Sequence, residues 1–194
     1  NKQTADILKA MQKVEASCLS ANYWAILPFK LGEQQIVKYR LVPENADLGA
    51  PSVDNDYLAL DLQRRLRHSG ATFRFEVQLR TNPEEMPLNN AQAEWSCKAA
   101  PEGSPFVCIA RLHLAQQNIT ATGQAELGDN LAFNIWRTLA AHEPLGSIAL
   151  ARKSAYAASA HARHTANGQQ LQEPKQLSEF KPQHCRRCQQ HDFE

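Results

Sequence analysis

Four polar side chains between residues 150 and 165 have the types and spacing of a ligand site. Arg152, Tyr156, Ser159 and Arg163 follow one another at steps of four, three and four residues. On an α-helix these steps place all four side chains on one face. The residues between them are mostly alanine, the best helix former, which also lets a helix pack close to its neighbour. A polar stripe on such a helix favours a bound ligand.

Length, composition and charge limit the class of protein that could present this helix. With 194 residues, 43% hydrophobic content and a net charge of +1, the chain can form one domain with a hydrophobic core. The balanced charge gives no indication of a nucleic-acid partner, and no apolar run approaches the roughly 20 residues of a membrane span. Five irregularly spaced cysteines indicate a reducing compartment, so we expect a cytoplasmic protein.

The first part of the chain is expected to supply a short helix and a β-hairpin. Apolar residues recur at helical spacing over residues 4–17, with Thr4 as a possible N-cap. Residues 23–29 and 36–42 have extended character and are joined by a turn around Gly32, which predicts a hairpin. Residues 44–55 are rich in Pro, Asn, Asp and Gly and are expected to form a loop.

A second helix and two long strands follow. Leu58, Leu62 and Leu66 recur every four residues after Asp56, a possible N-cap, and the pattern ends before Gly70. Apolar and polar residues alternate over 72–80, which predicts a half-buried strand. Residues 106–114 predict another long strand, with Cys108, Ala110, Leu112 and Leu114 on one face. Several strands separated by long excursions favour part of an antiparallel barrel or a strongly curved sheet.

The remaining segments lack a regular pattern. Residues 120–144 predict a long irregular connection of the kind that wraps around another part of a protein. Beyond Gly168 the chain is polar and contains two prolines, so residues 169–194 are expected to form a loosely attached tail. Residues 1–168 would then form the domain.

Several segments together resemble the C-terminal haem-binding region of the catalase superfamily, in particular its smaller catalase-like members. The matching segments are FNIW, HEPLGSI, ARKSAY and HARH, preceded by YWAILPFKLGEQQIVKYRLVP, FRFEVQLRTNPEEMPLNNAQAEW and SPFVCIARLHL. They cover most of residues 20–168 in the same order as in the family. The resemblance implies an α+β fold, namely part of a catalase-like antiparallel β-barrel with a wrapping connection and a C-terminal proximal haem helix.

The resemblance also implies roles for three residues and a cofactor. Tyr156 matches the proximal ligand of the iron in haem b, Arg152 the arginine that donates to its phenolate, and Arg163 an arginine near the propionates. This sequence departs from the family pattern at Ile135, where the family commonly has proline, and at Glu143, where it often has arginine. The implied substrate is hydrogen peroxide or an organic hydroperoxide.

The chemistry of the pair agrees with this assignment. A free tyrosine titrates near pH ~10, so a phenolate at neutral pH needs both the metal charge and a nearby cation. Arginine keeps its proton in proteins, and Arg152 lies one turn before Tyr156 on the same face. An anionic oxygen ligand stabilises Fe(III) and favours heterolytic O–O cleavage of a peroxide. On spacing alone, the alternative is a half-buried aromatic beside a solvated arginine.

The distal half of such a site is missing from the sequence. None of the seven histidines lies in a segment that resembles the family's distal motif, whose histidine moves the peroxide proton. We therefore expect residues 1–194 to be the C-terminal part of a longer haem protein, or a truncated copy of one. The first hypothesis is a catalase-like or peroxidase-like protein that metabolises hydroperoxides. The alternative is a non-catalytic remnant or interaction module.

The tail contains a competing candidate for a metal site. His184, Cys185, Cys188 and His191 offer two thiolates and two imidazoles, the ligand types of a tetrahedral zinc site. All four lie within eight residues of an expected disordered tail that has no second zinc-knuckle motif. We therefore interpret them as incidental.

Overall fold

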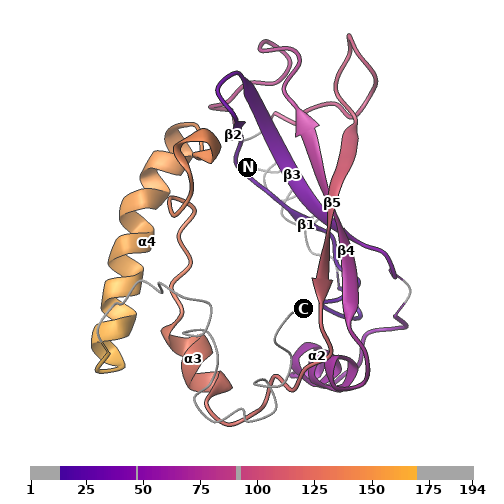
Figure 1. The fold of residues 1–194 in the computed structure, drawn as a ribbon, viewed down its shortest axis with the longest axis vertical. Helices are drawn as coiled ribbons and strands as arrows, with labels where there is room; N and C mark the ends of the chain where they lie inside the picture. Colours follow the sequence, from indigo (N-terminus) through magenta and orange to yellow (C-terminus); the bar gives the residue numbers. More distant parts are fainter. Residues whose placement is uncertain (1–13, 47, 91–92, 170–194) are drawn as a thin grey trace, which may run out of the picture. The chain divides into compact units, whose positions relative to one another are not determined.

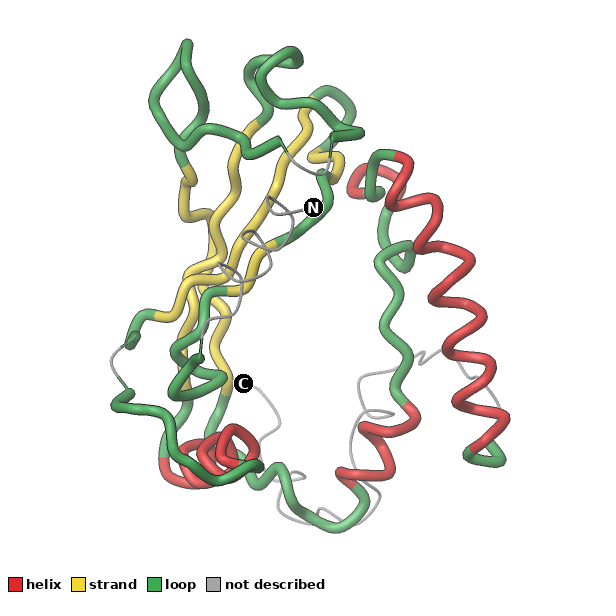
Figure 2. The backbone as a smooth tube through the Cα atoms, turned by 180° about the vertical axis from the view of Figure 1, so that it is seen from behind, coloured by secondary structure: helices red, strands yellow, loops and turns green. Residues whose placement is uncertain are grey.

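The computed structural model describes residues 14–46, 48–90 and 93–169 (Figures 1 and 2). The chain divides into two compact units that both contribute to one β-sheet. Of the described residues, unit 1 contains 14–24, 40–46, 48–76 and 108–118. Unit 2 contains 25–39, 77–90, 93–107 and 119–169. Among the described residues, no helix is long and apolar enough to span a membrane.

The sheet has five strands in the order β1-β3-β4-β5, and β2 also pairs with β3. The strands are β1 (Tyr23–Trp24), β2 (Phe29–Leu31), β3 (Gln35–Pro43), β4 (Ala71–Leu79) and β5 (Phe106–Leu114). Both β1 and β2 pair with β3 in antiparallel register, with Tyr23 opposite Leu41 and Phe29 opposite Val37. The structure is therefore α+β with an open antiparallel sheet, and the expected barrel is not closed within the described residues.

The predicted hairpin is present, but its first strand is divided in two. Strands β2 and β3 are joined by a turn in which Gly32 has a φ of 72°, a conformation that favours glycine. Pro28 lies just before β2 and has no N–H to donate to a ladder, so the strand predicted over 23–29 is interrupted.

Two helices were predicted in the first part of the chain, over residues 4–17 and after Asp56, and the structure shows the second. Helix α2 (Tyr57–His68) begins after Asp56 and ends before Gly70, as predicted, although the Asp56 side chain makes no capping hydrogen bond. Residues 4–13 of the first prediction lie outside the described residues. Residues 14–17 are not helical, because the Ser17 hydroxyl accepts a hydrogen bond from the Leu19 N–H and closes a local turn instead.

Strand β4 is buried on both faces, so the prediction of a half-buried strand is wrong for its polar side. Phe73 and Val77 are buried as expected, but Glu76 and Gln78 on the other face are buried too. The Glu76 carboxylate lies between Arg40 (2.7 Å) and Arg74 (2.9 Å). The Gln78 amide donates to main-chain oxygens of the 95–104 loop, at 2.8 Å for Ser104. Each buried polar group therefore has partners, which makes its burial tolerable.

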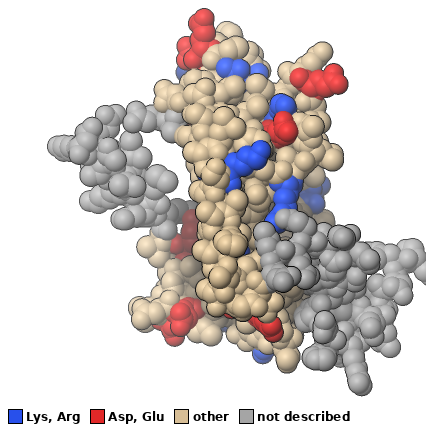
Figure 3. All heavy atoms as spheres, turned by 90° about the vertical axis from the view of Figure 1, so that its left-hand side faces the viewer, with Lys and Arg blue, Asp and Glu red and all other residues tan. Residues whose placement is uncertain are grey.

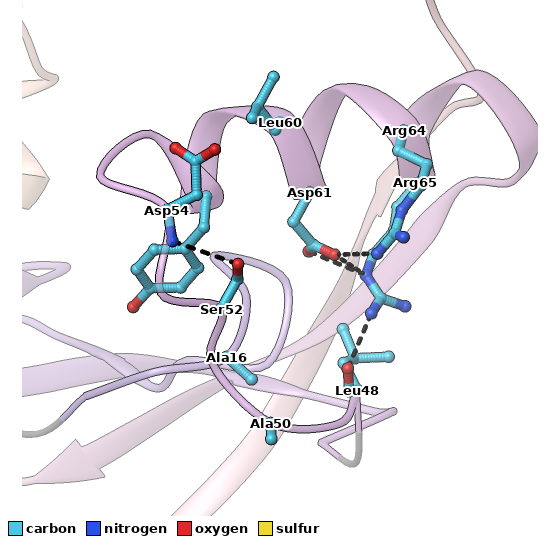
Figure 4. Close-up of a pocket in the computed structure, with 10 residues that line it drawn as sticks. Ala16, Leu48, Ala50, Ser52, Asp54, Leu60, Asp61, Arg64 and Arg65 are labelled. Atoms are coloured by element: carbon cyan, nitrogen blue, oxygen red, sulfur yellow. Dashed lines mark hydrogen bonds and ion pairs between the residues drawn. The ribbon is translucent and has the colours of Figure 1, made fainter.

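A cavity of about 250 Å³ lies between α2 and the loop around residues 48–54 in unit 1. Figure 4 shows the Asp61 carboxylate turned toward Arg65, whose guanidinium also donates to the Leu48 carbonyl at 2.8 Å. Burial alone would raise the pKa of Asp61, but hydrogen bonds from Ser17, Arg65 and Arg64 hold it below its usual value. The Asp61 carboxylate is satisfied by Arg64 and Arg65, so we interpret these three residues as a support for the loop.

Gly70 precedes β4 at a close approach of two main-chain segments in unit 1. A Cβ at this position would lie 2.4 Å from the main-chain oxygen of Leu114. We expect Gly70→Ala to lower the free energy of unfolding by about 1–3 kcal/mol, measured by urea denaturation, because backbone must shift. Gly128→Ala is the matched control, since nothing lies within 4 Å of its Cβ position. An equal effect of both substitutions would contradict the close-approach argument.

The connection after β5 is more regular than predicted. It contains helix α3 (Gln124–Asn130) and a 3₁₀ turn (Ala140–His142), and it leads into helix α4 (Ser147–Ala166). The sequence of α3 is short but starts with good helix formers after Gly123, whose φ is 85°. The prediction of a wholly irregular connection over 120–144 is therefore wrong at α3. The tail and its His184, Cys185, Cys188 and His191 lie outside the described residues.

Candidate functional site

Helix α4 contains the residues predicted to bind a ligand, and the chain just before it is tied to β2. Three main-chain hydrogen bonds join residues 141–145 to residues 28–32: Gly32 N–H to Ala141 O (3.0 Å), Lys30 N–H to Glu143 O (2.9 Å) and Leu145 N–H to Pro28 O (2.8 Å). The alternation is that of an antiparallel pair. The ammonium group of Lys30 also lies 2.9 Å from the Glu143 carboxylate. Glu143, a departure from the family pattern, therefore has a partner of its own.

The first turn of α4 is capped by a residue 58 positions earlier in the chain. The N-cap position is Gly146, which has no side chain to cap the helix. The Asn89 side-chain oxygen instead accepts a hydrogen bond from the Ser147 N–H at 2.8 Å. Gly146 itself has a φ of 95°, and a Cβ there would lie 3.0 Å from the Leu88 carbonyl oxygen. The loop around residue 89 therefore fixes where α4 begins.

Removing this cap should cost a measurable part of the stability. We expect Asn89→Ala to lower the free energy of unfolding by about 1 kcal/mol, because the Ser147 N–H loses its acceptor. Asn89→Asp keeps the acceptor and adds a negative charge near the N-terminus of the helix, so its stability should equal or exceed that of the wild type. Urea denaturation followed by circular dichroism measures both. Equal losses in both variants would contradict the capping role.

The segment 130–136 lies along one side of α4 in unit 2 (Figure 2). The indole N–H of Trp136 donates to the Ala149 carbonyl at 3.1 Å, and the Lys153 ammonium lies 4.5 Å from the centre of the Trp136 ring. Near the end of the helix, an imidazole nitrogen of His164 lies 2.9 Å from the Asn130 carbonyl oxygen. Contacts at both ends therefore set the rotation of α4 about its axis.

Arg152 and Tyr156 are brought together on this helix. The Arg152 guanidinium donates a hydrogen bond to the Tyr156 hydroxyl oxygen, and its central carbon lies 5.0 Å from the centre of the tyrosine ring. Both side chains are half-buried. A cation that donates to the phenol oxygen is the arrangement that stabilises the deprotonated, metal-binding form. The pair therefore fits the requirements of a tyrosinate ligand.

The other two members of the predicted face are placed differently. Ser159 is exposed, and Arg163 is exposed with its guanidinium donating to the main-chain carbonyl of Leu131. In the space-filling view of the α4 side, most of the surface is uncharged and Lys and Arg atoms gather in its middle part (Figure 3). Arg163 is thus engaged with the backbone and is not part of the Arg152–Tyr156 pair.

Sequence reasoning missed the residues that hold α4 in place. Asn89 and Lys30 act over long sequence separations, and the only local signal was Gly146, a helix start without a capping side chain. His164 is also buried, with 4% of its surface exposed, and its Nδ1 atom has no hydrogen-bond partner among the described residues. No group of three or more His, Cys, Asp or Glu in the described part of the chain could hold a metal ion by itself.

Comparisons with known proteins support a fold, not a sequence family. No family model matches the sequence, and no curated protein matches it. The structure is, however, similar to the crystal structure of a fungal catalase, with a TM-score of 0.63 over 81% of this chain. The fold is catalase-like. The sequence identity is 18%, and this chain spans 34% of that catalase, so the similarity concerns the architecture of about a third of a larger protein.

Proposed function

We propose that this chain forms the proximal side of a haem site in a cytoplasmic, catalase-like or peroxidase-like protein that metabolises hydroperoxides. The observation that supports the proposal most is the Arg152–Tyr156 hydrogen bond on α4, within a catalase-like fold. Tyr156 would bind the iron of haem b, and Arg152 would keep its oxygen anionic. The haem would supply the iron centre at which hydrogen peroxide or an organic hydroperoxide reacts.

Arg163 is proposed to face the propionate groups. A guanidinium has five N–H donors, so its hydrogen bond to the Leu131 carbonyl leaves others for a carboxylate. It lies two turns after Tyr156, on the same predicted face of the helix. The same contact with Leu131 would limit the freedom of the side chain and hold it at the edge of the site.

The distal side of the site would come from residues beyond those matched here. This chain spans about a third of the similar catalase, so a complete site requires a larger assembly. Among the described histidines, His113 contacts the Thr72 hydroxyl at 3.0 Å and His164 contacts the Asn130 carbonyl. Both are engaged in contacts within their own units. A second candidate function is a catalase-like module without catalysis of its own, since this chain spans 34% of the similar catalase.

Binding of ferric haem separates the two functions. In a titration of the purified 194-residue chain with ferric haem, the first proposal expects the absorption and electron paramagnetic resonance signals of a high-spin ferric tyrosinate at neutral pH. Arg152→Gln should weaken these signals, because the cation that donates to the Tyr156 oxygen is lost. Lys153→Gln removes a neighbouring positive charge and is the matched control.

Each result has a clear meaning. Signals that depend on Arg152 but not on Lys153 support the haem proposal. If no tyrosinate signal appears at any pH while circular dichroism shows intact secondary structure, the haem proposal is contradicted. The catalase-like module without catalysis of its own is then the remaining candidate. Equal losses of signal in both variants would indicate a general charge effect and would contradict the specific role of Arg152.

A further inference from the structure

Arg80, the residue that follows β4, holds the loop that leads to the cap of α4. Its guanidinium group donates from Nε to the Met86 carbonyl oxygen at 2.7 Å and from Nη2 to the Pro83 carbonyl oxygen at 3.1 Å. Its main-chain N–H donates to the Ile36 carbonyl oxygen at 2.8 Å, which fixes the backbone of Arg80 to β3. One residue therefore joins the sheet to two points of the following loop.

The turn that this guanidinium holds is closed and packed. The main-chain oxygen of Asn82 accepts from the Met86 N–H at 2.9 Å, and its side-chain oxygen accepts from the Glu84 N–H at 2.9 Å. The Met86 side chain is fully buried, with 0% of its surface exposed, and its sulfur accepts from the Thr81 N–H at 3.4 Å. A planar guanidinium has several N–H donors in a fixed arrangement, so it can hold two carbonyl groups of such a turn at once.

A short and restricted segment connects this turn to α4. Asn89, which caps the helix at the Ser147 N–H, lies three residues after Met86. Pro87, between them, has its φ fixed by the ring, and its carbonyl oxygen accepts from the indole N–H of Trp95 at 3.3 Å. Because the segment has little conformational freedom, holding the Met86 carbonyl also restrains the position of the Asn89 side chain.

We propose that Arg80 is a positioning residue for α4, acting through this loop and the Asn89 side chain. All residues of the path lie in unit 2. Without Arg80, the Asn89 side chain would move away from the Ser147 N–H more often, and the first turn of α4 would lose its acceptor. The extension to the candidate site rests on the proposed function: Arg152 and Tyr156 lie on α4 within three turns of Ser147.

Exchange of the Ser147 amide hydrogen with solvent tests this path without haem. NMR of the full ¹⁵N-labelled chain under native conditions measures it. We expect Asn89→Ala to speed the exchange about fivefold, which corresponds to the loss of one cap. Arg80→Ala should speed it by a similar factor. The double variant should also stay near about fivefold, because both substitutions act on the same hydrogen bond.

Two further variants separate this role from a general loss of stability. Gly70→Ala is expected to destabilise the chain from unit 1, so it should leave the Ser147 exchange rate unchanged if that exchange occurs by local opening. Arg80→Lys keeps the stem and the charge but not the planar fork, so it should still speed the exchange about twofold or more. This variant also tests the path if Arg80→Ala does not fold.

Four results would overturn the proposal. They are a wild-type exchange rate in Arg80→Ala, a wild-type rate in Arg80→Lys, equal acceleration by Gly70→Ala, and a multiplied effect of about 25-fold in the double variant. The last result would mean that Arg80 and Asn89 act independently.

The haem titration tests whether the path reaches the candidate site. Arg80→Ala and Asn89→Ala should weaken the ferric tyrosinate signals to a similar extent. Signals weakened by Asn89→Ala but not by Arg80→Ala would contradict the positioning role. If the wild type shows no such signals, the proposed function fails, and the exchange rates of Ser147 still decide the role of Arg80 separately.

Discussion

A Tyr156→Phe variant is expected to lose the ferric tyrosinate signals of the haem-loaded chain completely. Phenylalanine keeps the ring and its packing but removes the only oxygen that Arg152 contacts on this ring. Without that oxygen there is no phenolate to bind iron, whatever the charge of Arg152. The complete loss distinguishes this variant from Arg152→Gln, in which the signals should only be weakened. Absorption and electron paramagnetic resonance spectra measure it.

Tyr57→Phe is the matched control for this substitution. Tyr57 is also half-buried and its hydroxyl donates to the Glu15 carbonyl at 2.8 Å, so the control removes one buried hydroxyl in unit 1. Its haem spectra should be those of the wild type. If the tyrosinate signals survive in Tyr156→Phe but disappear in Tyr57→Phe, the iron ligand is Tyr57 on α2. That result would refute the proposal for α4.

Glu76→Ala is expected to destabilise the chain by about 2–3 kcal/mol. The carboxylate is 8% exposed and bridges Arg40 on β3 and Arg74 on β4. Removing one member of a buried ion pair leaves charge without compensation, which typically costs about 3–5 kcal/mol. The expected loss is smaller because Arg40 and Arg74 are 25% and 40% exposed and regain water. Glu102→Ala, at an exposed pair with Lys98, should change stability by less than about 1 kcal/mol.

The Glu76 carboxylate should also make the free energy of unfolding depend on pH in the acid range. Burial raises the pKa of Glu76, but hydrogen bonds from Arg74 and Arg40 outweigh it and hold the pKa below its usual value. A glutamate in the unfolded chain titrates near about pH 4.3. The contribution of Glu76 is therefore complete above that pH and is lost as the pH falls through the lower pKa of the folded state. Glu76→Gln should show a shallower loss of stability below about pH 4, measured by urea denaturation at several pH values.

Local patterns predicted the regular elements well. The four-residue leucine spacing located α2, and the alternation around Phe73 located β4, because both patterns report on the geometry of a single element. The spacing of Arg152 and Tyr156 likewise placed two side chains in contact within one helix. The roles assigned to these residues stay predictions, since geometry alone does not show a bound haem.

Long-range contacts could not be predicted in this way. The burial of Glu76 depends on Arg40 from a neighbouring strand, and the cap on Ser147 depends on Asn89, 58 residues earlier. Neither residue stands out in its own segment, because exposed glutamates and loop asparagines are common. The helix prediction failed at residues 14–17 for the opposite reason. There a local side-chain hydrogen bond replaced the helix that the apolar spacing indicated.

The anchoring of α4 from outside has a consequence for how this surface can vary. The three main-chain hydrogen bonds to residues 28–32 involve no side chain, and the Asn89 cap uses a single amide oxygen. Substitutions on the exposed side of α4 would therefore change the surface of the helix without moving the residue at which the helix begins. The start of the helix would then stay fixed while the residues on its exposed side vary, so one scaffold could present different ligand-contacting surfaces.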